Sequence, residues 1–437
     1  MHCQHVGADN ATLRFALLHL FQLTQSAFQG LVRFCPAGPL PMIPELRHTY
    51  NSAFSNERYQ EMLAAIEQQL PGQLEFRLAE TPVFVPAILR DKLISAGESI
   101  VDVIRQDNFS QLTEAAIPPA QRVPGPEGRP EFLTFDFAVC RDGNGELEPQ
   151  LIEIQGFPSL YAFQSWLPEV FGQHFPISDA VSAFLETPSA ADYRAEMREF
   201  LLGGEAPENV ILLELFPERQ KTRVDFALTK KFWEIDAVCL TKVRKNGRQL
   251  FYEKDGRQIP IKRIYNRVIF DELTRYPDLP GEFRLTDDVD VTWVGHPNWF
   301  FRISKFTLPL LRGPFVPPSY YLHELAAYPA DLENYVLKPL FSFAGAGVRL
   351  HVSAADLDAL PDKHHYLLQR KVQYEPVVQS PDGLVKCEIR LLYIWPPDQA
   401  RPRLLCGLSR LSRGEMIGVD FNKNKDWVGG TTPLFER

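Results

Sequence analysis

Residues 335–350, with the sequence YVLKPLFSFAGAGVRL, place one lysine at the end of a strand and directly before a loop of small residues. The apolar residues before Lys338 fit a buried strand, and Lys338 itself provides a point charge. The small residues between Ser342 and Gly347 let backbone N–H groups approach an anion closely. The segment therefore predicts a site for a nucleotide phosphate. A small-residue hairpin in a β-rich protein has a similar pattern.

Two strand-like segments and a polar tail follow in an interpretable order. Residues 365–376 predict a strand with a polar end, where backbone groups can face an adenine edge and Glu375 can accept from a ribose hydroxyl. The next segment, KCEIRLLYIW, alternates with the period of a strand and places Glu388 and Arg390 on one face. A solvated strand face gives the same alternation. The tail at 407–430 is richer in polar and cationic groups than a core needs.

A hairpin is predicted much earlier in the chain, between residues 133 and 160. Two alternating segments flank the sequence DGNG at 142–145, which favours a tight turn because Gly and Asn accept positive φ. Folding this hairpin brings Asp136 close to Glu153 and Gln155. Two carboxylates and an amide oxygen are hard ligands that suit Mg²⁺. Taken alone, however, this segment favours an exposed hairpin with an acidic face.

These segments, in this order, resemble an ATP-grasp ligase. The metal hairpin precedes the nucleotide segments, as it does in the circularly permuted eukaryotic glutathione synthetase branch. The ending DFNKNKDWVGG is similar to that of the ribosomal-protein glutamate ligase branch. The resemblance covers residues 130–160 and 295–437. It implies an α+β ATP-grasp fold, in which two α+β subdomains grip ATP, with a small α/β substrate domain and a permuted metal-binding hairpin near the N-terminal third.

The resemblance also implies a role for each candidate residue. The contacts to ATP are expected from Lys305, Lys338, Ser342, Gly345, Gln369, Arg370, Lys371, Val372 and Glu375, with the adenine hinge at 368–372. The magnesium positions match Asp136, Glu153 and Gln155. The contacts to phosphoryl and acyl-phosphate oxygens are expected from Arg390, Arg413 and Asn424. Two positions depart from the family pattern, because Gln155 stands where Asn is usual and Ser342 stands where the glutathione synthetase branch has a glutamate.

Composition limits the classes of protein that fit. The chain has 437 residues and is 45% hydrophobic, enough for two or three domains with substantial cores. A net charge of −9 argues against a general nucleic-acid binder, because it repels a polyanion. Six cysteines without CxxC spacing predict a reducing compartment, so we expect a cytoplasmic protein. No apolar run reaches the roughly 18 residues of a membrane span. The pair His364-His365 predicts an exposed loop.

The sequence pattern divides the chain into four parts. Residues 1–41 predict a disordered or non-native extension, without the basic region and cleavage site of a signal peptide. Residues 42–200 combine the metal hairpin with helices, one capped at Ser55 and one at 87–106. A Pro/Gly-rich link at 117–130 leads to the hairpin and is expected to be mobile.

The third part, residues 201–297, predicts the α/β substrate domain. Its expected elements are strands at 209–215 and 237–241, a helix at 223–233 and a hairpin within 244–257. The strand at 262–268 places Arg263, Tyr265 and Arg267 on one face, where Arg267 can hold a substrate carboxylate through two hydrogen bonds. A solvent-facing basic strand edge is the alternative. The fourth part, residues 298–437, is the expected nucleotide-binding region.

The function that follows is an ATP-dependent, ADP-forming ligase that joins a carboxylate to an amine or thiol through an acyl phosphate. Its expected cofactors are ATP and Mg²⁺, and its partners are small-molecule carboxylates and amines, with neither nucleic acid nor membrane. Two alternatives stay open. One is a degenerate ATP-grasp protein that binds nucleotide without turnover, and the other is a non-catalytic scaffold that holds a partner in the cleft.

Overall fold

The computed structural model describes residues 42–437 except for 343–344, 416 and 418–421. The expectation for residues 1–41 and the part of the small-residue loop at Ala344 lie outside this described region. Within it, no helix is long and apolar enough to cross a membrane. Helices and several separate sheets give the mixed α+β character that the sequence predicts.

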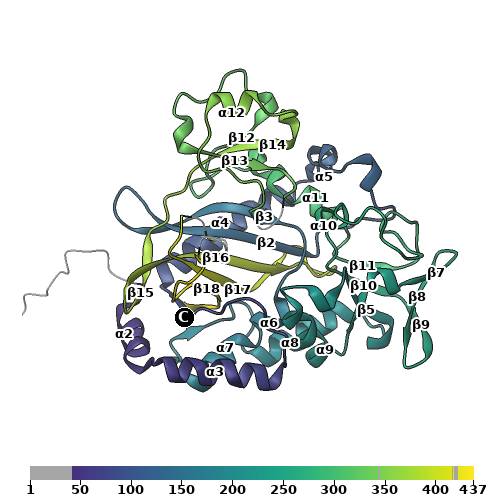
Figure 1. Cartoon of the computed structure of the whole chain (residues 1–437), viewed down its shortest axis with the longest axis horizontal. Coiled ribbons are helices and arrows are strands. Elements are labelled where there is room, and N and C mark those ends of the chain that lie inside the picture. Colours follow the sequence, from purple (N-terminus) through teal and green to yellow (C-terminus); the bar gives the residue numbers. More distant parts are fainter. Residues whose placement is uncertain (1–41, 343–344, 416, 418–421) are drawn as a thin grey trace, which may run out of the picture. The chain divides into compact units, whose positions relative to one another are not determined.

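The largest sheet joins two segments that are far apart in the sequence. Its strands are β2 (Phe132–Arg141), β3 (Leu147–Gln155), β15 (Pro376–Ser380), β16 (Gly383–Ile394), β17 (Arg403–Ser412) and β18 (Gly429–Thr431). They follow the order β18-β17-β16-β2-β3, and β15 pairs with β16 (Figure 1). Strands β2 and β16 are antiparallel, with Arg390 opposite Asp136. The predicted metal hairpin therefore lies directly beside the strand that carries Arg390.

One face of this sheet packs against α4 (Ala87–Ile104), as predicted for that segment. The apolar side of α4 shares a buried cluster with Leu391 and Tyr393 of β16. Because side chains alternate along a strand, Glu388 and Arg390 point to the opposite face. Both are less than a tenth exposed, so the alternative of a solvated strand face is wrong.

The opposite face packs against α6 (Tyr161–Gln164) and α7 (Leu167–His174), which share a buried cluster with Leu392 and Ile394 of β16. The Tyr161 hydroxyl donates to the Tyr393 carbonyl at 2.8 Å and so ties α6 to β16. Helix α8 (Ala190–Leu202) follows. Strand β4 (Val181–Ser182) lies between α7 and α8 in the chain. Strand β4 belongs to a small sheet with β1 (Val83–Val85) and β19 (Pro433–Glu436).

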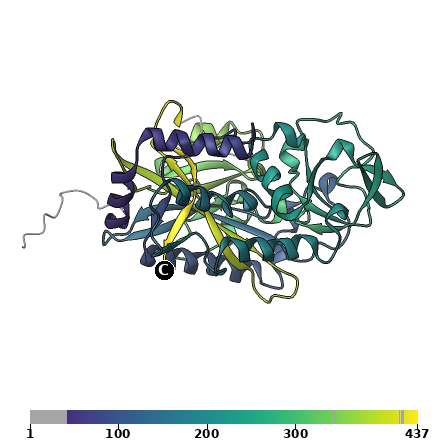
Figure 2. The same cartoon turned by 90° about the horizontal axis from the view of Figure 1, so that it is seen from below.

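The first two described helices are α2 (Pro44–Ala53) and α3 (Asn56–Gln69). Helix α3 begins at the predicted cap, because the Ser55 side chain accepts a hydrogen bond from the Arg58 N–H. It packs against α7, and Figure 2 shows α2 and α3 meeting at a steep angle.

A second, fully parallel sheet follows the order β11-β10-β5-β6. Its strands are β5 (Val210–Glu214), β6 (Asp236–Cys239), β10 (Arg263–Asn266) and β11 (Thr292–Val294), and α9 (Arg223–Trp233) connects β5 to β6. The predictions of strands near 209–215 and 237–241 and of a helix at 223–233 are confirmed. A further sheet, β7 (Arg244–Asn246), β8 (Gln249–Lys254) and β9 (Arg257–Ile261), contains the hairpin that was predicted around Asp255.

Strand β10 lies between β5 and β11, inside the parallel sheet. Ile264, Tyr265 and Asn266 are all buried, so both faces of the strand are covered. The alternative of a solvent-facing basic edge at 262–268 is therefore wrong. A parallel strand covered on both faces lacks the period-two contrast by which sequence distinguishes a solvent face.

The segment with Lys338 belongs to an antiparallel sheet of β12 (Ser319–Tyr321), β14 (Tyr366–Arg370) and β13 (Tyr335–Pro339), in that order. Helix α12 (Ala354–Asp358) lies between β13 and β14 in the chain. Val336 pairs with Gln369, which places Lys338 two residues further along β13. The His364-His365 pair is exposed, as predicted.

The Pro/Gly-rich link at 117–130 is held in place, contrary to the expectation that it is mobile. The Asn298 side chain bonds both the N–H and the carbonyl of Val123, each at 3.0 Å. Glu127 accepts from Arg302 at 2.6 Å. The remaining short helices are α5 (Phe109–Leu112), α10 (Phe270–Leu273) and α11 (Trp299–Arg302).

Candidate functional site

Asp136 is the centre of a buried charge cluster on the face of the large sheet that points away from α4. Its carboxylate accepts from Arg390 Nε at 2.5 Å and from Arg390 Nη2 at 2.6 Å. Arg410 Nη2 donates to the same carboxylate at 2.9 Å and also contacts Glu388. Only 1% of Asp136 is exposed, so the alternative of an exposed acidic hairpin is wrong. Two arginines offset the cost of burying its charge.

Glu153 and Gln155 extend the cluster along β3. Lys305 Nζ lies 3.1 Å from Glu153 Oε2, and Gln155 Nε2 donates to Glu153 Oε1 at 2.7 Å. Burial by itself raises the pKa of Glu153, but Lys305 and Lys338 outweigh it and lower the pKa to about 2. Glu153 is therefore ionised at neutral pH. The amide oxygen of Gln155 is buried without a hydrogen-bond partner.

Lys338 reaches the cluster from β13. Its ammonium donates to Gln369 Oε1 at 2.6 Å and to the carbonyl of Ile152 at 2.9 Å. Ile152 is the extra residue of a β-bulge, since Asp136 pairs with Glu153 and the next residue of β2 pairs with Leu151. The bulge turns the Ile152 carbonyl away from β2 and makes it available to the lysine. Burial lowers the pKa of Lys338 to about 8, and Glu153 opposes this decrease.

Lys305 connects the cluster to the small-residue loop. It is the first residue of a short 3₁₀ helix, and its ammonium donates to the Ser342 carbonyl at 2.6 Å. A cavity of about 20 Å³ remains beside Gln155, Lys305 and Ser342. This volume holds about one water molecule.

Of the predicted hinge residues, Gln369 binds Lys338 in the cluster, whereas Arg370 and Lys371 bind other parts of the chain. Arg370 Nη1 donates to Asp331 at 3.2 Å, and Lys371 Nζ donates to the Glu333 carbonyl at 2.6 Å. Glu375 accepts from Arg141 Nε at 2.9 Å. Val372 is half-buried, and Gly345 has a φ of 75° in the turn after β13. Their assignment to ATP stays a prediction.

The predicted tail residues also stand apart from Asp136. Arg413 donates to Ser380 Oγ at 2.5 Å and to the Asp426 carbonyl at 3.0 Å. Asn424 is exposed and has a φ of 58°. The buried asparagine of this segment is Asn422, whose amide oxygen accepts from the Arg413 N–H at 2.9 Å. The roles of Arg413 and Asn424 stay predictions.

Arg267 occupies the carboxyl end of β10, opposite Glu214 at the end of β5. Its Nη2 lies 3.9 Å from Glu214 Oε2, another guanidinium nitrogen donates to the Pro158 carbonyl, and Nε is buried without a partner. Burial raises the pKa of Glu214 to about 8, and Arg267 opposes the increase. Pro158 follows Gln155 by three residues, so the chain after β3 connects the charge cluster to Arg267.

The sequence analysis did not assign Arg410 or Tyr374, and both belong to the cluster. Arg410 joins Asp136 to Glu388, and the Tyr374 hydroxyl donates to Glu388 Oε2 at 3.0 Å. Pairing of β17 with β16 places Arg410 directly opposite Glu388. This pairing of two long strands is the signal that could have identified Arg410.

Across the residues that the structure describes, no group of three or more His, Cys, Asp or Glu side chains is arranged to hold a metal. A cation at the predicted site would therefore depend on Glu153 and on the free amide oxygen of Gln155, completed by oxygens from a ligand or water. Asp136 is closely paired with two arginines. The magnesium assignment stays a prediction.

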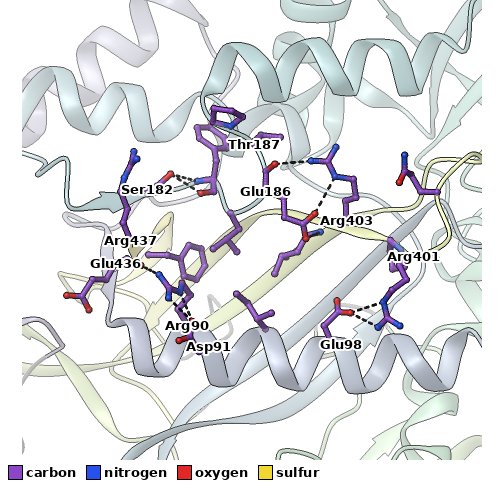
Figure 3. A pocket seen from close by; sticks show the side chains of 18 of the residues that line it. Arg90, Asp91, Glu98, Ser182, Glu186, Thr187, Arg401, Arg403, Glu436 and Arg437 are labelled. Carbon is purple, nitrogen blue, oxygen red and sulfur yellow. Dashed lines mark hydrogen bonds and ion pairs between the residues drawn. The ribbon is translucent and has the colours of Figure 1, made fainter.

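A separate open groove of about 1070 Å³ lies between α4, the segment at 182–188 and the segment at 399–404 (Figure 3). Its rim carries ion pairs, including Arg401 with Glu98 at 2.5 Å. None of the predicted site residues lines it. The groove and the charge cluster are therefore distinct.

Comparison with solved structures identifies the fold of this chain. Neither a protein-family model nor a curated protein matches the sequence. Among solved structures, a glutathione synthetase-like effector from Globodera pallida in its apo form superposes with a TM-score of 0.56. The match covers 88% of this chain and 99% of the effector, at 11% sequence identity. This chain has a glutathione synthetase-like fold. At this identity the likeness concerns the fold alone.

Proposed function

We propose that this protein is an ATP-dependent ligase that activates a carboxylate as an acyl phosphate and transfers it to an amine or thiol. One observation carries the proposal. In a glutathione synthetase-like fold, Lys305, Lys338 and Arg390 converge with Glu153 and an unpartnered amide oxygen of Gln155 on one face of the sheet. Cations beside hard oxygen ligands are the groups that bind a magnesium nucleotide.

The residues of the cluster fit both parts of a magnesium nucleotide, the phosphates and the metal ion. Lys305 and Lys338 would bind phosphate oxygens, because both ammonium groups are buried and each binds carbonyl, amide or carboxylate oxygens that phosphate oxygens can replace. Glu153 and the free Gln155 oxygen would hold magnesium, which would neutralise negative charge on the phosphates. An ATP-grasp arrangement, with the nucleotide between the large sheet and β13–β14, accounts for these positions.

The substrate carboxylate is assigned to Arg267. In open α/β sheets ligands bind at the carboxyl ends of the strands, where Arg267 and Glu214 lie. The Nε of Arg267 has no partner, and a guanidinium binds a carboxylate through two parallel hydrogen bonds. Glu214, with its raised pKa, would be largely neutral beside that carboxylate and would not repel it.

The reaction would proceed in two transfers. A carboxylate oxygen of the substrate attacks the γ-phosphorus of ATP, the bond to the β-phosphate oxygen breaks, and ADP leaves with that electron pair. An amine or thiol then attacks the acyl carbon and releases inorganic phosphate. Lys338 and Arg390 would stabilise charge on the transferred group, because fixed cations in a buried site need no reorganisation.

A second candidate function is nucleotide binding without turnover. Both oxygens of Asp136 accept hydrogen bonds from Arg390, and Arg410 binds one of them as well. If these pairs persist in the loaded site, Asp136 contributes no metal ligand. Nucleotide would then bind through the lysines while phosphoryl transfer stays slow.

The test is to supply Mg²⁺-ATP, hydroxylamine and a pool of amino acids or small peptides. Hydroxylamine traps an acyl phosphate, so a ligase forms hydroxamate and ADP in equal amounts, and Arg390→Ala loses both products together. Arg403→Ala is the matched control, because Arg403 pairs with Glu186 at the separate groove. AMP and pyrophosphate as products would contradict the acyl-phosphate route. ATP binding without ADP formation would favour the second candidate.

A further inference from the structure

We infer that contacts among its own charged side chains keep this site closed, so that magnesium and ATP open it together and each greatly strengthens the binding of the other. The inference rests on the proposed function and concerns how that same site is loaded. It depends on a latch, which we define as Lys305 with its two partners, Glu153 and the Ser342 carbonyl.

The latch joins two parts of the chain across the predicted phosphate position. Lys305 Nζ lies 3.1 Å from Glu153 Oε2 on β3 and donates at 2.6 Å to Ser342, which follows β13. Lys338 is held similarly, by Ile152 and Gln369. A phosphate that binds Lys305 and Lys338 therefore has to replace these oxygens and break these contacts.

The charges of the cluster oppose either ligand when it binds alone. Its charged side chains are the cations Lys305, Lys338, Arg390 and Arg410 and the carboxylates Asp136, Glu153 and Glu388. ATP that binds without metal pairs its phosphates with Lys305, so the ion pair between Lys305 and Glu153 breaks. The Glu153 carboxylate then lies unpaired beside the phosphates. Repulsion between them is strong in a buried site, where water screens little.

Magnesium that binds without ATP is also opposed by repulsion. It can coordinate Glu153 only if Lys305 loses this carboxylate partner, and the Lys305 ammonium then lies unpaired beside a second cation. When both ligands bind, the metal pairs with Glu153 while a phosphate pairs with Lys305, and no charge is left alone. The coupling is reciprocal, so the factor by which magnesium strengthens ATP binding equals the factor by which ATP strengthens magnesium binding.

One substitution has opposite expected effects with and without metal. Glu153→Gln removes the negative charge of the latch but keeps an oxygen that can accept from Gln155 Nε2, as Glu153 does now at 2.7 Å. Without metal, ATP binds the variant more tightly, because Lys305 is released and no carboxylate repels the phosphates. With metal, ATP binds the variant more weakly, because a metal ligand is lost. A merely structural role for Glu153 would shift both affinities in the same direction.

The experiment is calorimetric titration of the full chain with ATP, in excess Mg²⁺ and in excess EDTA. For the wild-type protein we expect magnesium to strengthen ATP binding by about 5- to 150-fold, the usual range of coupling between sites. Glu153→Gln should bind ATP several-fold more tightly in EDTA and several-fold more weakly in Mg²⁺. Glu148→Gln, the same change on the same strand, should match wild type in both, because the Glu148 carboxylate accepts a hydrogen bond from Gln150 and not from a residue of the latch.

Equal ATP affinity of the wild-type protein with and without metal would overturn the inference and leave the proposed function standing. A shift of Glu153→Gln in the same direction under both conditions would also overturn it. The wild-type comparison needs no variant to fold. Absence of ATP binding under every condition is a different result, because it would overturn the proposed function and the inference with it.

Discussion

Glu153 shows how the cluster keeps a charge in a buried place. Its side chain is 16% exposed, and burial alone would favour the neutral acid. Lys305 and Lys338 reverse this preference and lower the pKa to about 2. The same carboxylate in turn limits the decrease in the pKa of Lys338. Each charge of the cluster therefore depends on the others, and removal of one leaves its partner unpaired.

Lys338 gives the first prediction at this scale. Lys338→Ala should weaken ATP binding by about 1.5–3 kcal/mol, the usual contribution of a hydrogen bond to a charged group. Calorimetry with Mg²⁺ measures the loss. Lys363→Ala is the control, because Lys363 lies in the segment before β14 and contacts Tyr328 and Asp358 instead. A folded Lys338→Ala variant that binds ATP like the parent would show that the phosphate assignment is wrong.

The raised pKa of Glu214 predicts how the stability of the protein depends on pH. Its folded pKa of about 8 lies above the ordinary value of 4.5, so the folded state binds the proton more tightly than the unfolded state. The associated stabilisation is complete below pH 4.5 and is lost as pH rises through 8, with a slope of up to about 1.4 kcal/mol per pH unit. Urea unfolding at several pH values should show this decrease.

Glu214→Gln should flatten that decrease between pH 6 and 8. A smaller decrease of the same sign should remain up to about pH 7, because burial also raises the pKa of Glu131 to about 7 and that of Asp225 to about 6. Glu218→Gln is the control, since the Glu218 side chain is 65% exposed. An unchanged slope in Glu214→Gln would mean that Glu214 is ionised in the folded protein.

At the scale of elements, the β2–β3 hairpin positions most of the candidate site. The DGNG turn fixes the pairing of its two strands, and the bulge at Ile152 turns a carbonyl towards Lys338. Directly after Gln155 the chain passes close to α11. The backbone at Gly156 donates to the Ile303 carbonyl at 2.9 Å, so the end of β3 is fixed to the segment that leads to Lys305.

Gly156→Ala tests this close approach. A Cβ at this position would lie 2.5 Å from the Trp299 carbonyl oxygen and 2.9 Å from Ile303 Cβ. Overpacking of this kind should destabilise the protein by about 1–3 kcal/mol in urea unfolding. Gly172→Ala has the opposite expectation, a gain of about 0.5–1 kcal/mol, because Gly172 is exposed in α7 with no atom within 4 Å of an added Cβ. Equal stability of the two variants would contradict the predicted clash.

Local sequence patterns were enough to predict the β2–β3 hairpin and α9. The turn residues predicted the β2–β3 hairpin, and the apolar pattern predicted α9 with its observed bounds, Arg223–Trp233. Burial depended on partners that no local pattern contains. A solvent-facing edge stayed open as an alternative for the strand at 262–268, which the structure places between β5 and β11. The link at 117–130 was expected to be mobile, but Asn298 holds it from elsewhere in the chain.

At the scale of the molecule, the fold brings residues 132–155 into one sheet with residues 383–431. The hairpin predicted that Asp136, Glu153 and Gln155 converge, since only neighbouring strands are involved. The pairing of β2 with β16 and of β16 with β17 adds Arg390 and Arg410, and it spans more than half of the chain. Such pairings depend on the whole fold, so the sequence predicted neither the place of Arg410 in the cluster nor the pairing of Asp136 with two arginines.

The most direct test is a crystal structure of the protein with Mg²⁺ and a non-hydrolysable ATP analogue. The account predicts phosphate oxygens within hydrogen-bonding distance of Lys305 and Lys338, magnesium in contact with Glu153, and Lys305 released from the Ser342 carbonyl. A nucleotide bound in the groove beside α4 would contradict the account. So would a magnesium ion that has Glu153 beyond its first two coordination shells.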